Sequence, residues 1–207
     1  MKRNIMKSAI LGSLAAVSML LSACSTAGPG DVLSRADEAF ENGRYWLALR
    51  NYSVVVESLK PEQEMNVGWM YYTGSGTPRN LKEALEWYSR AADTGSPEAM
   101  FALADLYENG PAAVADENKA AVLYYKAAGA GNTDAMLSLG RCYENGTGVD
   151  SNVKEAVYWY EKAAEKGNAE AMLNLAQIYV SDALGEPDAA AAAKWRAAET
   201  LAEEQTE

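Results

Sequence analysis

Residues that could act as nucleophiles or bases are scarce in this sequence. Its 207 residues include no histidine, so the commonest general base and metal ligand is missing. Cys142 could act as a nucleophile, but without histidine a thiol lacks its usual base. The residues that stand 36 or 72 positions away from Cys142, namely Met70, Leu106 and Ile178, are all apolar. We therefore interpret Cys142 as a buried structural thiol.

Two other motifs could carry chemistry, and each also has a structural interpretation. Gly74-Ser75-Gly76 could form a phosphate-binding loop, but it lacks the lysine of a Walker motif, which favours a turn between helices. Asp105, Glu108 and Glu144 could supply an acid pair. Because the chain has 29 acidic residues, a solvated acidic face is the favoured interpretation. A glycan-active enzyme would need two carboxylates about 5–9 Å apart in a cleft.

The first residues have the pattern of an export signal. Three basic residues precede an apolar run over residues 9–21, which is shorter than the about 20 residues of a membrane span. The run ends in Leu21-Ser22-Ala23-Cys24, which resembles a bacterial lipobox. This resemblance implies a signal peptide over residues 1–23, a lipid on Cys24 and a linker over residues 24–30. A soluble signal peptide with an incidental cysteine is the alternative.

A lipid on Cys24 would attach the protein to a membrane without spanning it, since each buried methylene contributes about 0.8 kcal/mol. In lipoproteins of this type a residue other than aspartate after the cysteine directs the protein to the outer membrane. Ser25 therefore implies the outer membrane of a Gram-negative cell envelope, with the folded part facing the periplasm. We expect no contact with the membrane apart from this anchor.

The charge of the chain restricts its partners. Residues 1–23 hold three of the 18 basic residues and none of the acidic ones, which leaves 15 basic against 29 acidic residues and a net charge of −14. Such a chain repels nucleic acid and favours a basic partner or simply high solubility. With Cys24 acylated, Cys142 has no cysteine to pair with. We expect no metal and no cofactor other than the lipid.

Internal repetition is the dominant pattern. Residues of the same kind recur every 36 positions without a gap, and composition alone does not explain why tyrosine and glycine stay in phase with alanine. The columns are Gly68, Ala104, Gly140 and Ala176; Tyr71, Tyr107, Tyr143 and Tyr179; Ala84, Ala120, Ala156 and Ala192; Trp87, Leu123, Trp159 and Trp195; Tyr88, Tyr124 and Tyr160; and Gly95, Gly131 and Gly167.

Each repeat has the apolar spacing of two helices. In the third repeat we predict helices over residues 134–144 and 152–166, with Gly167 ending the second. Ser96 and Pro97 have the types of a helix cap and a first-turn residue, and Pro187 is expected to open the last helix in the same way. One hairpin cannot bury its apolar faces alone, so the hairpins should stack.

At these residues the chain resembles Sel1-like repeats, which are relatives of the tetratricopeptide repeat. The resemblance implies an all-α fold, a right-handed superhelical solenoid of antiparallel helix pairs. Residues 31–62 resemble a tetratricopeptide-type hairpin. The repeats are expected at 63–98, 99–134 and 135–170, with a degenerate repeat or cap at 171–207. The second repeat departs from the pattern, since Pro111-Ala112-Ala113 replaces its glycine loop.

In this fold the first helices line a concave groove, so two columns beside the structural ones are candidate partner contacts. The columns vary between repeats, as expected for a groove that binds one ligand and equally for neutral surface. Trp69 is an aromatic among polar residues, and it could instead pack under the N-terminal hairpin near Tyr45 and Trp46. The candidates are Asn66, Ser138 and Asn174, beside Ala102, in one column and Trp69, Asp105, Arg141 and Gln177 in the other.

The resemblance implies a non-enzymatic protein–protein interaction adaptor or scaffold, a monomeric lipoprotein of the bacterial cell envelope. Similar lipoproteins help to assemble secretion machinery, including that for exopolysaccharide, so the expected partner is another envelope or secreted protein. A second hypothesis is a periplasmic immunity protein that neutralises a secreted toxin. A third, which the lack of histidine disfavours, is an envelope glycan-active enzyme.

Overall fold

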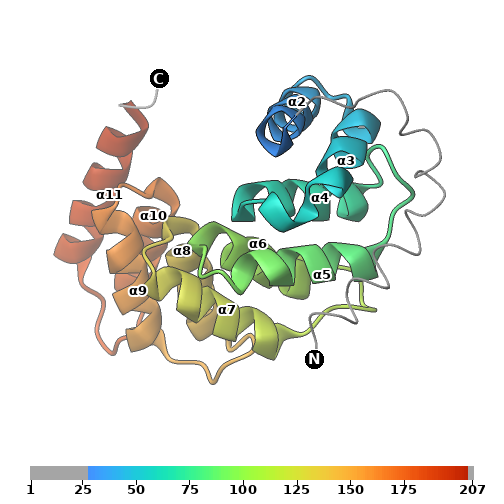
Figure 1. The fold of residues 1–207 in the computed structure, drawn as a ribbon. Helices are drawn as coiled ribbons and strands as arrows, with labels where there is room; N and C mark the ends of the chain where they lie inside the picture. Colours follow the sequence, from blue (N-terminus) through green and yellow to red (C-terminus); the bar gives the residue numbers. More distant parts are fainter. Residues whose placement is uncertain (1–27, 205–207) are drawn as a thin grey trace. The chain divides into compact units, whose positions relative to one another are not determined.

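The repeat columns of the sequence correspond to pairs of helices. The computed structural model describes residues 28–204, and these contain α-helices, one short 3-10 helix and no strand (Figure 1). The predicted signal peptide and Cys24 lie outside the described residues. The elements are α2 (Pro29–Glu41), α3 (Tyr45–Val54), η2 (Val56–Ser58), α4 (Pro61–Thr73), α5 (Leu81–Ala92), α6 (Pro97–Asn109), α7 (Glu117–Gly129), α8 (Thr133–Asn145), α9 (Val153–Glu165), α10 (Ala169–Val180) and α11 (Ala189–Glu204).

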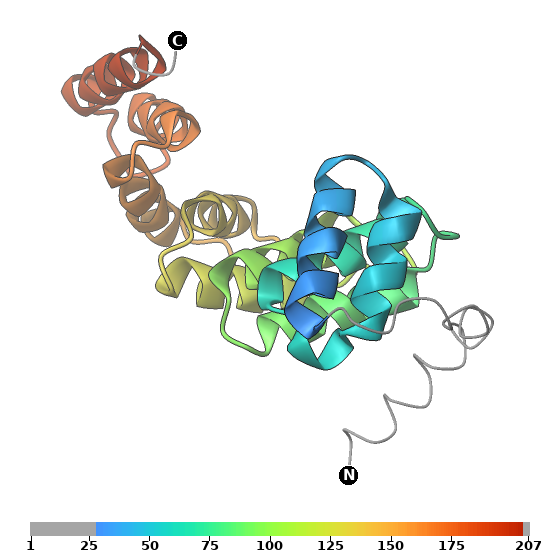
Figure 2. The ribbon, with the colours of Figure 1, turned by 45° about the horizontal axis from the view of Figure 1, so that its top comes forward.

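The chain divides into two units, one that ends at Trp87 and one that begins at Tyr88. In the first unit α2 packs on α3, and α3 contacts α4. In the second unit α6 pairs with α7, α8 with α9 and α10 with α11, while α7 also packs on α8 and α9 on α10 (Figure 2). The second unit is therefore a stack of three helix pairs, which is the arrangement expected of repeats that cannot bury their apolar faces alone.

Polar side chains define where the helices begin. Ser96, Asn132 and Asn168 stand 36 residues apart, and each side chain accepts a hydrogen bond from the backbone N–H three residues later, at 3.2, 2.8 and 2.8 Å. These bonds satisfy amides that a helix leaves without an internal partner. The predicted helices of the third repeat agree with α8 and α9 to within one residue at each end.

The loop inside each repeat is closed by one recurring hydrogen bond. The residue before the second helix donates its N–H to the carbonyl of the tyrosine column, and this bond is kept although the glycine pattern is lost in the second repeat. The pairs are Asn80 to Tyr71 (2.9 Å), Asp116 to Tyr107, Asn152 to Tyr143 and Asp188 to Tyr179 (2.8 Å each). Backbone closure thus tolerates Pro111-Ala112-Ala113.

The expectation that Pro187 opens the last helix in its first turn is wrong. The helix α11 begins at Ala189, and Pro187 lies one residue before its cap. Asp188 provides the cap, because its side chain accepts from the N–H groups of Ala190 and Ala191 at 3.0 and 2.9 Å. The carboxylate of Asp188 keeps the position that Asn152 has in the preceding repeat, so the 36-residue period decides the boundary.

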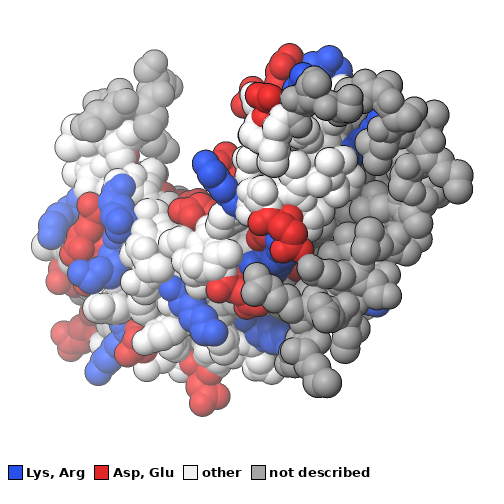
Figure 3. All heavy atoms as spheres, in the orientation of Figure 1, with Lys and Arg blue, Asp and Glu red and all other residues white. Residues whose placement is uncertain are grey.

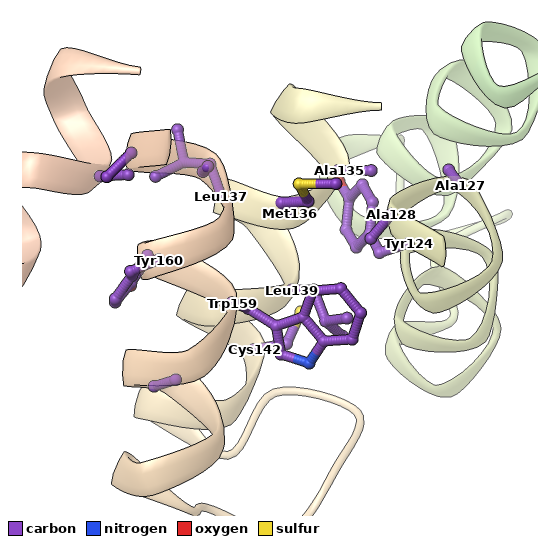
Figure 4. Packing of buried hydrophobic residues seen from close by; sticks show 14 of the residues in the cluster. Tyr124, Ala127, Ala128, Ala135, Met136, Leu137, Leu139, Cys142, Trp159 and Tyr160 are labelled. Carbon is purple, nitrogen blue, oxygen red and sulfur yellow. The ribbon is translucent and has the colours of Figure 1, made fainter. Parts of the chain in front are cut away.

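The core of the second unit is built from alanine and large aromatic residues. Ala120, Ala156 and Ala192 are at most 3% exposed, and their small size allows the paired helices to approach closely. Tyr124 and Tyr160 are also buried there. Figure 4 shows the core side chains between the helices, with the ring of Trp159 beside Leu139 and Cys142. Packing of this density makes the core sensitive to added volume.

Gly140 shows how closely two helices of one repeat approach. A β-carbon placed on Gly140 of α8 would lie 2.5 Å from the ring of Tyr160 on α9. Gly129, at the end of α7, has no atom within 4 Å of such a carbon. The two glycines are therefore a matched pair, one in contact with a buried ring and one in open space.

We predict that Gly140→Ala lowers the free energy of unfolding by about 1–3 kcal/mol, because the ring of Tyr160 must move in a packed core. Gly129→Ala should raise the same quantity by about 0.4–1 kcal/mol, since alanine has less backbone freedom to lose. Urea unfolding followed by circular dichroism measures both values. Equal midpoints for the two variants would contradict the close approach.

Candidate protein-binding surface

The first candidate column is tied to buried tyrosines of the preceding hairpin. The side chain of Asn66 on α4 lies near the hydroxyl of Tyr52 on α3, close enough to favour the ionised form of that hydroxyl. Seventy-two residues later, Ser138 on α8 has the same relation to Tyr124 on α7. Both candidates are half-buried. Asn66 and Ser138 therefore lie beside buried tyrosines of the preceding hairpin rather than fully in solvent.

The same tyrosines donate to carboxylates of their own hairpins. The hydroxyl of Tyr124 donates to Oε2 of Glu108, and that of Tyr160 to Oε2 of Glu144, each at 2.7 Å. The sequence interpretation of Glu108 and Glu144 as part of a solvated acidic face missed this role. The spacing carried a signal for it, since both carboxylates stand 16 residues before a tyrosine of one column. These two acids are hydrogen-bond acceptors for buried hydroxyl groups.

Tyr52 makes the equivalent bond in the first unit. Its hydroxyl donates to Oδ1 of Asp37 at 2.7 Å, and the side chain of Gln63 donates to the other oxygen of Asp37 at 3.1 Å. Burial and, second, the hydrogen bond to Asp37 raise the pKa of Tyr52 above its ordinary value of 10.0. The N-terminal hairpin is thus joined to α4 by polar contacts of the same kind as those of the repeats.

Trp69 packs against the N-terminal hairpin. Its ring centroid lies 5.7 Å from that of Phe40 and 5.2 Å from that of Tyr45. The rings of Phe40 and Tyr45 are themselves in edge contact at 5.5 Å. These are favourable geometries for aromatic contacts. The sequence allowed two roles for Trp69, partner binding or packing under the N-terminal hairpin, and the structure shows the packing contacts.

The second candidate column lies in solvent in the second unit. Asp105, Arg141 and Gln177 are exposed, whereas Asn174 and Ala102 of the first column are half-buried. Asp105 accepts a hydrogen bond from the amide of Asn109 at 2.8 Å. Arg141 forms an ion pair with Glu170, which joins α8 to α10. Of the predicted contacts, Asp105, Arg141 and Gln177, called the first-helix row below, are the ones free to meet a partner.

Charge is divided between the two rows of helices in the second unit. The first helices α6, α8 and α10 carry six acidic residues and one basic residue, Arg141. The second helices α7 and α9 together carry four of each sign. In the face drawn in Figure 3, charged side chains of both signs are interspersed with uncharged surface. The first helices therefore favour a basic partner.

The other candidates for chemistry have structural surroundings. Burial raises the pKa of the Cys142 thiol to about 12, so it stays protonated at neutral pH. Gly74 and Gly76 have φ angles of 80° and 75°, and a β-carbon on Gly76 would lie 2.4 Å from the backbone nitrogen of Trp46.

The described part of the chain holds no group of three or more acidic, cysteine or histidine side chains that could hold a metal ion. No helix over residues 28–204 is long and apolar enough to cross a membrane.

The buried tyrosines predict a loss of stability at alkaline pH. Burial raises the pKa of Tyr71 to about 12, and burial followed by carboxylate hydrogen bonds raises the pKa of Tyr124 and Tyr160 above the ordinary 10.0. A group whose pKa is raised on folding contributes its full stability at pH values below the pKa that it has in the unfolded chain. This contribution is lost as the pH rises toward the pKa that the group has in the folded chain.

We therefore expect the midpoint of urea unfolding to fall as the pH is raised above 10. The helical circular dichroism signal should be lost over the same pH range in which the ultraviolet absorbance of tyrosinate appears from the buried tyrosines. Tyr124→Phe should weaken this dependence, since phenylalanine has no proton to lose. An unchanged pH dependence in that variant would argue against the role of this hydroxyl.

Solved structures with the same architecture include relatives of greater length. A Sel1 repeat protein from Oxalobacter formigenes is 26% identical with a TM-score of 0.72, over 84% of this chain and 52% of that one. A protective antigen of uropathogenic Escherichia coli with an SLR fold is 29% identical with a TM-score of 0.75, over 87% and 39%. The chain thus spans about half, or less, of these two relatives.

An immunity protein of Pseudomonas aeruginosa, PA5088, is 21% identical with a TM-score of 0.50, over 88% of this chain and 72% of that one, which is a likeness of fold. No curated protein matched the sequence. The model of the Sel1 repeat matches residues 64–96, 97–132, 133–168 and 169–195, which is more than half of the chain. The all-α fold of repeated helix pairs and this fourfold match show that the chain belongs to the Sel1 repeat family.

Proposed function

We propose that this chain is a lipid-anchored adaptor of the bacterial cell envelope that binds another protein through its first-helix row. Sel1 repeats mediate protein–protein interaction. The observation that carries the proposal is that Asp105, Arg141 and Gln177 stand in phase with buried columns yet are exposed and differ in each repeat. Packing constrains their neighbours and leaves these side chains for recognition. The proposal assigns the chain no catalytic role.

The anchor is the lipid on Cys24. Support for it comes from the sequence alone, since Leu21-Ser22-Ala23-Cys24 follows a basic and then an apolar segment. The lipid would keep the adaptor at one membrane, which we propose to be the outer membrane with the repeats in the periplasm. Tethering raises the local concentration of the adaptor for a partner in the same membrane.

We predict that Cys24→Ser moves the protein from the membrane fraction to the soluble fraction of a Gram-negative host. The serine hydroxyl cannot form the thioether that links the lipid to the cysteine. Immunoblotting of separated fractions measures the change, and the mass of the mature wild-type protein should exceed that of its chain by the lipid. Ser25→Asp is the matched control, and we expect it to change which membrane holds the protein. A Cys24→Ser protein that stays with the membranes would rule out the anchor.

The acidic first helices support a partner with a basic surface. Electrostatic attraction between unlike surfaces accelerates association more than it raises affinity. We propose a component of a secretion or exopolysaccharide assembly as the partner. The same charge favours the second candidate, a periplasmic immunity protein that neutralises a basic toxin. The fold shared with the immunity protein of Pseudomonas aeruginosa is compatible with this role and does not by itself assign it.

The adaptor proposal predicts one stoichiometric partner when the lipidated protein is captured from native envelopes and bound proteins are identified by mass spectrometry. The triple variant Asp105→Ala, Arg141→Ala and Gln177→Ala should lose that partner by about tenfold or more, as expected when central contacts are removed. These residues are exposed, and the surface ion pair of Arg141 contributes little to stability, so folding should be preserved.

The matched control also removes one acid, one base and one amide from exposed positions outside the row, at Asp150, Lys166 and Asn118. It should retain the partner. Equal recovery by both triple variants would show that the first-helix row is not the contact. The identity of the protein recovered separates the two candidates, since an assembly component supports the adaptor and a toxin supports the immunity protein.

A further inference from the structure

An exposed apolar cluster lies on the second helices of the second unit, away from the first-helix row. Val122 and Tyr125 on α7 are 55% and 58% exposed, and Tyr158 on α9 is 49% exposed. Trp159 links the two helices, since its ring centroid lies 5.9 Å from that of Tyr125 and 5.1 Å from that of Tyr158. We call Val122, Tyr125 and Tyr158, with the supporting ring of Trp159, the aromatic face.

The repeat architecture does not require apolar residues at these positions. The positions equivalent to Val122 and Tyr158 hold Glu86 in the first repeat and Lys194 in the fourth. Those equivalent to Tyr125 hold Ser89, Glu161 and Ala197, none of them aromatic. Polar or small residues at the same positions of the other repeats show that a Sel1 repeat folds without this face. Exposed aromatic residues that packing does not demand are the kind that anchor protein interfaces.

Lysines surround the aromatic face. Lys126 lies one helical turn after Val122, and Lys154 and Lys162 lie one turn before and after Tyr158. The ammonium group of Lys162 lies 5.9 Å from the ring centroid of Tyr158. Lys126 and Lys154 form no ion pair with any residue that the structure describes. Figure 3 shows basic and acidic side chains beside uncharged surface in the region of α7 and α9.

The acidic residues of α9 offset part of the lysine charge. Glu165 pairs with Lys162 at 3.1 Å. Burial and then the charge of Glu161 raise the pKa of Tyr179 on α10, which places Glu161 near the next repeat. Burial and then the charge of Glu155 raise the pKa of Tyr143 on α8. Among the described residues, Lys126 and Lys154 are the lysines of the aromatic face that no ion pair neutralises, in a chain whose net charge is −11.

We propose that the aromatic face is a second docking surface, which binds an acidic segment of a partner protein through apolar side chains that contact Val122, Tyr125 and Tyr158. Charge complementarity with the three lysines selects acidic residues beside those anchors. An anionic bilayer fits less well, because the net negative charge of the chain opposes its approach. The surface is independent of the first-helix row and differs from it in charge, so the two surfaces would take different partners.

The test uses the full mature chain as the target for a displayed library of random 12-residue peptides. The variant Val122→Glu, Tyr125→Ser and Tyr158→Lys serves as counter-target, because each new residue is native to the same position of another repeat and should leave the fold intact. We expect enriched peptides with Asp or Glu next to Trp, Phe or Leu. Synthetic copies should bind the variant about tenfold or more weakly.

Two further variants separate the surfaces. Lys126→Glu with Lys154→Glu should weaken the peptides while leaving the aromatic residues in place, and the first-helix triple variant should bind them like the wild type. Circular dichroism verifies that each variant is folded. Loss of binding in the first-helix triple variant alone would transfer the site to that row and overturn the proposal.

Other occupants give distinct results that also overturn the proposal. Peptides without acidic enrichment, or no enriched peptide at all, would reject an acidic partner. Binding of the wild type but not the counter-target to phosphatidylglycerol vesicles would identify a membrane surface. Self-association in sedimentation that the counter-target lacks would identify a second copy of this chain. None of these results depends on whether the first-helix row binds its own partner.

Discussion

A tyrosine hydroxyl in an alanine-rich core must keep a hydrogen-bond partner, and this constraint organises the repeats. Leaving such a group unpaired costs about 1–3 kcal/mol. Tyr52, Tyr124 and Tyr160 are almost fully buried, and each donates to a carboxylate of the first helix in its own hairpin at 2.7 Å. The bond fixes the two helices of a hairpin against each other, and the small residues beside it allow the approach that the bond requires.

The same hydroxyls bring two residues of the first candidate column close to the core. Asn66 and Ser138, each on the next first helix along the chain, lie near the hydroxyls of Tyr52 and Tyr124. A buried tyrosine thereby has neighbours on its own hairpin and on the following one. In the fourth repeat Arg196 replaces the tyrosine and Val180 replaces the carboxylate, so this arrangement ends where the stack ends. Arg196 and Thr200 are exposed and Glu199 is half-buried, at positions where the third repeat buries Tyr160, Ala163 and Ala164.

The sequence predicted the helix pairs well because their determinants are local or periodic. Caps such as Ser96 and turns such as the one at Gly74 depend on neighbouring residues, and the 36-residue period places every core column. The roles of Glu108 and Glu144 depend on which way a side chain points across a hairpin, which residue type alone does not specify. The packing of Trp69 on Phe40 and Tyr45 needs the contact between hairpins. The aromatic face was missed because the columns were compared for the residues they share, although Glu86 and Lys194 at the positions equivalent to Val122 and Tyr158 indicate exposure.

Recognition in this chain follows from what the core leaves unconstrained. A repeat fixes the alanine, glycine and tyrosine columns, and the first and second helices each retain exposed positions that vary at no cost in packing. In the second unit the first helices α6, α8 and α10 carry six acidic residues against one basic residue, whereas α7 and α9 carry an exposed apolar cluster with lysines beside it. Two surfaces of unlike chemistry on one stack of helix pairs discriminate between partners. The acidic first helices repel acidic segments, and the lysines on the second helices repel basic ones. A scaffold that joins two unlike proteins needs this property, and the repeat supplies it because its two helices face solvent on different sides.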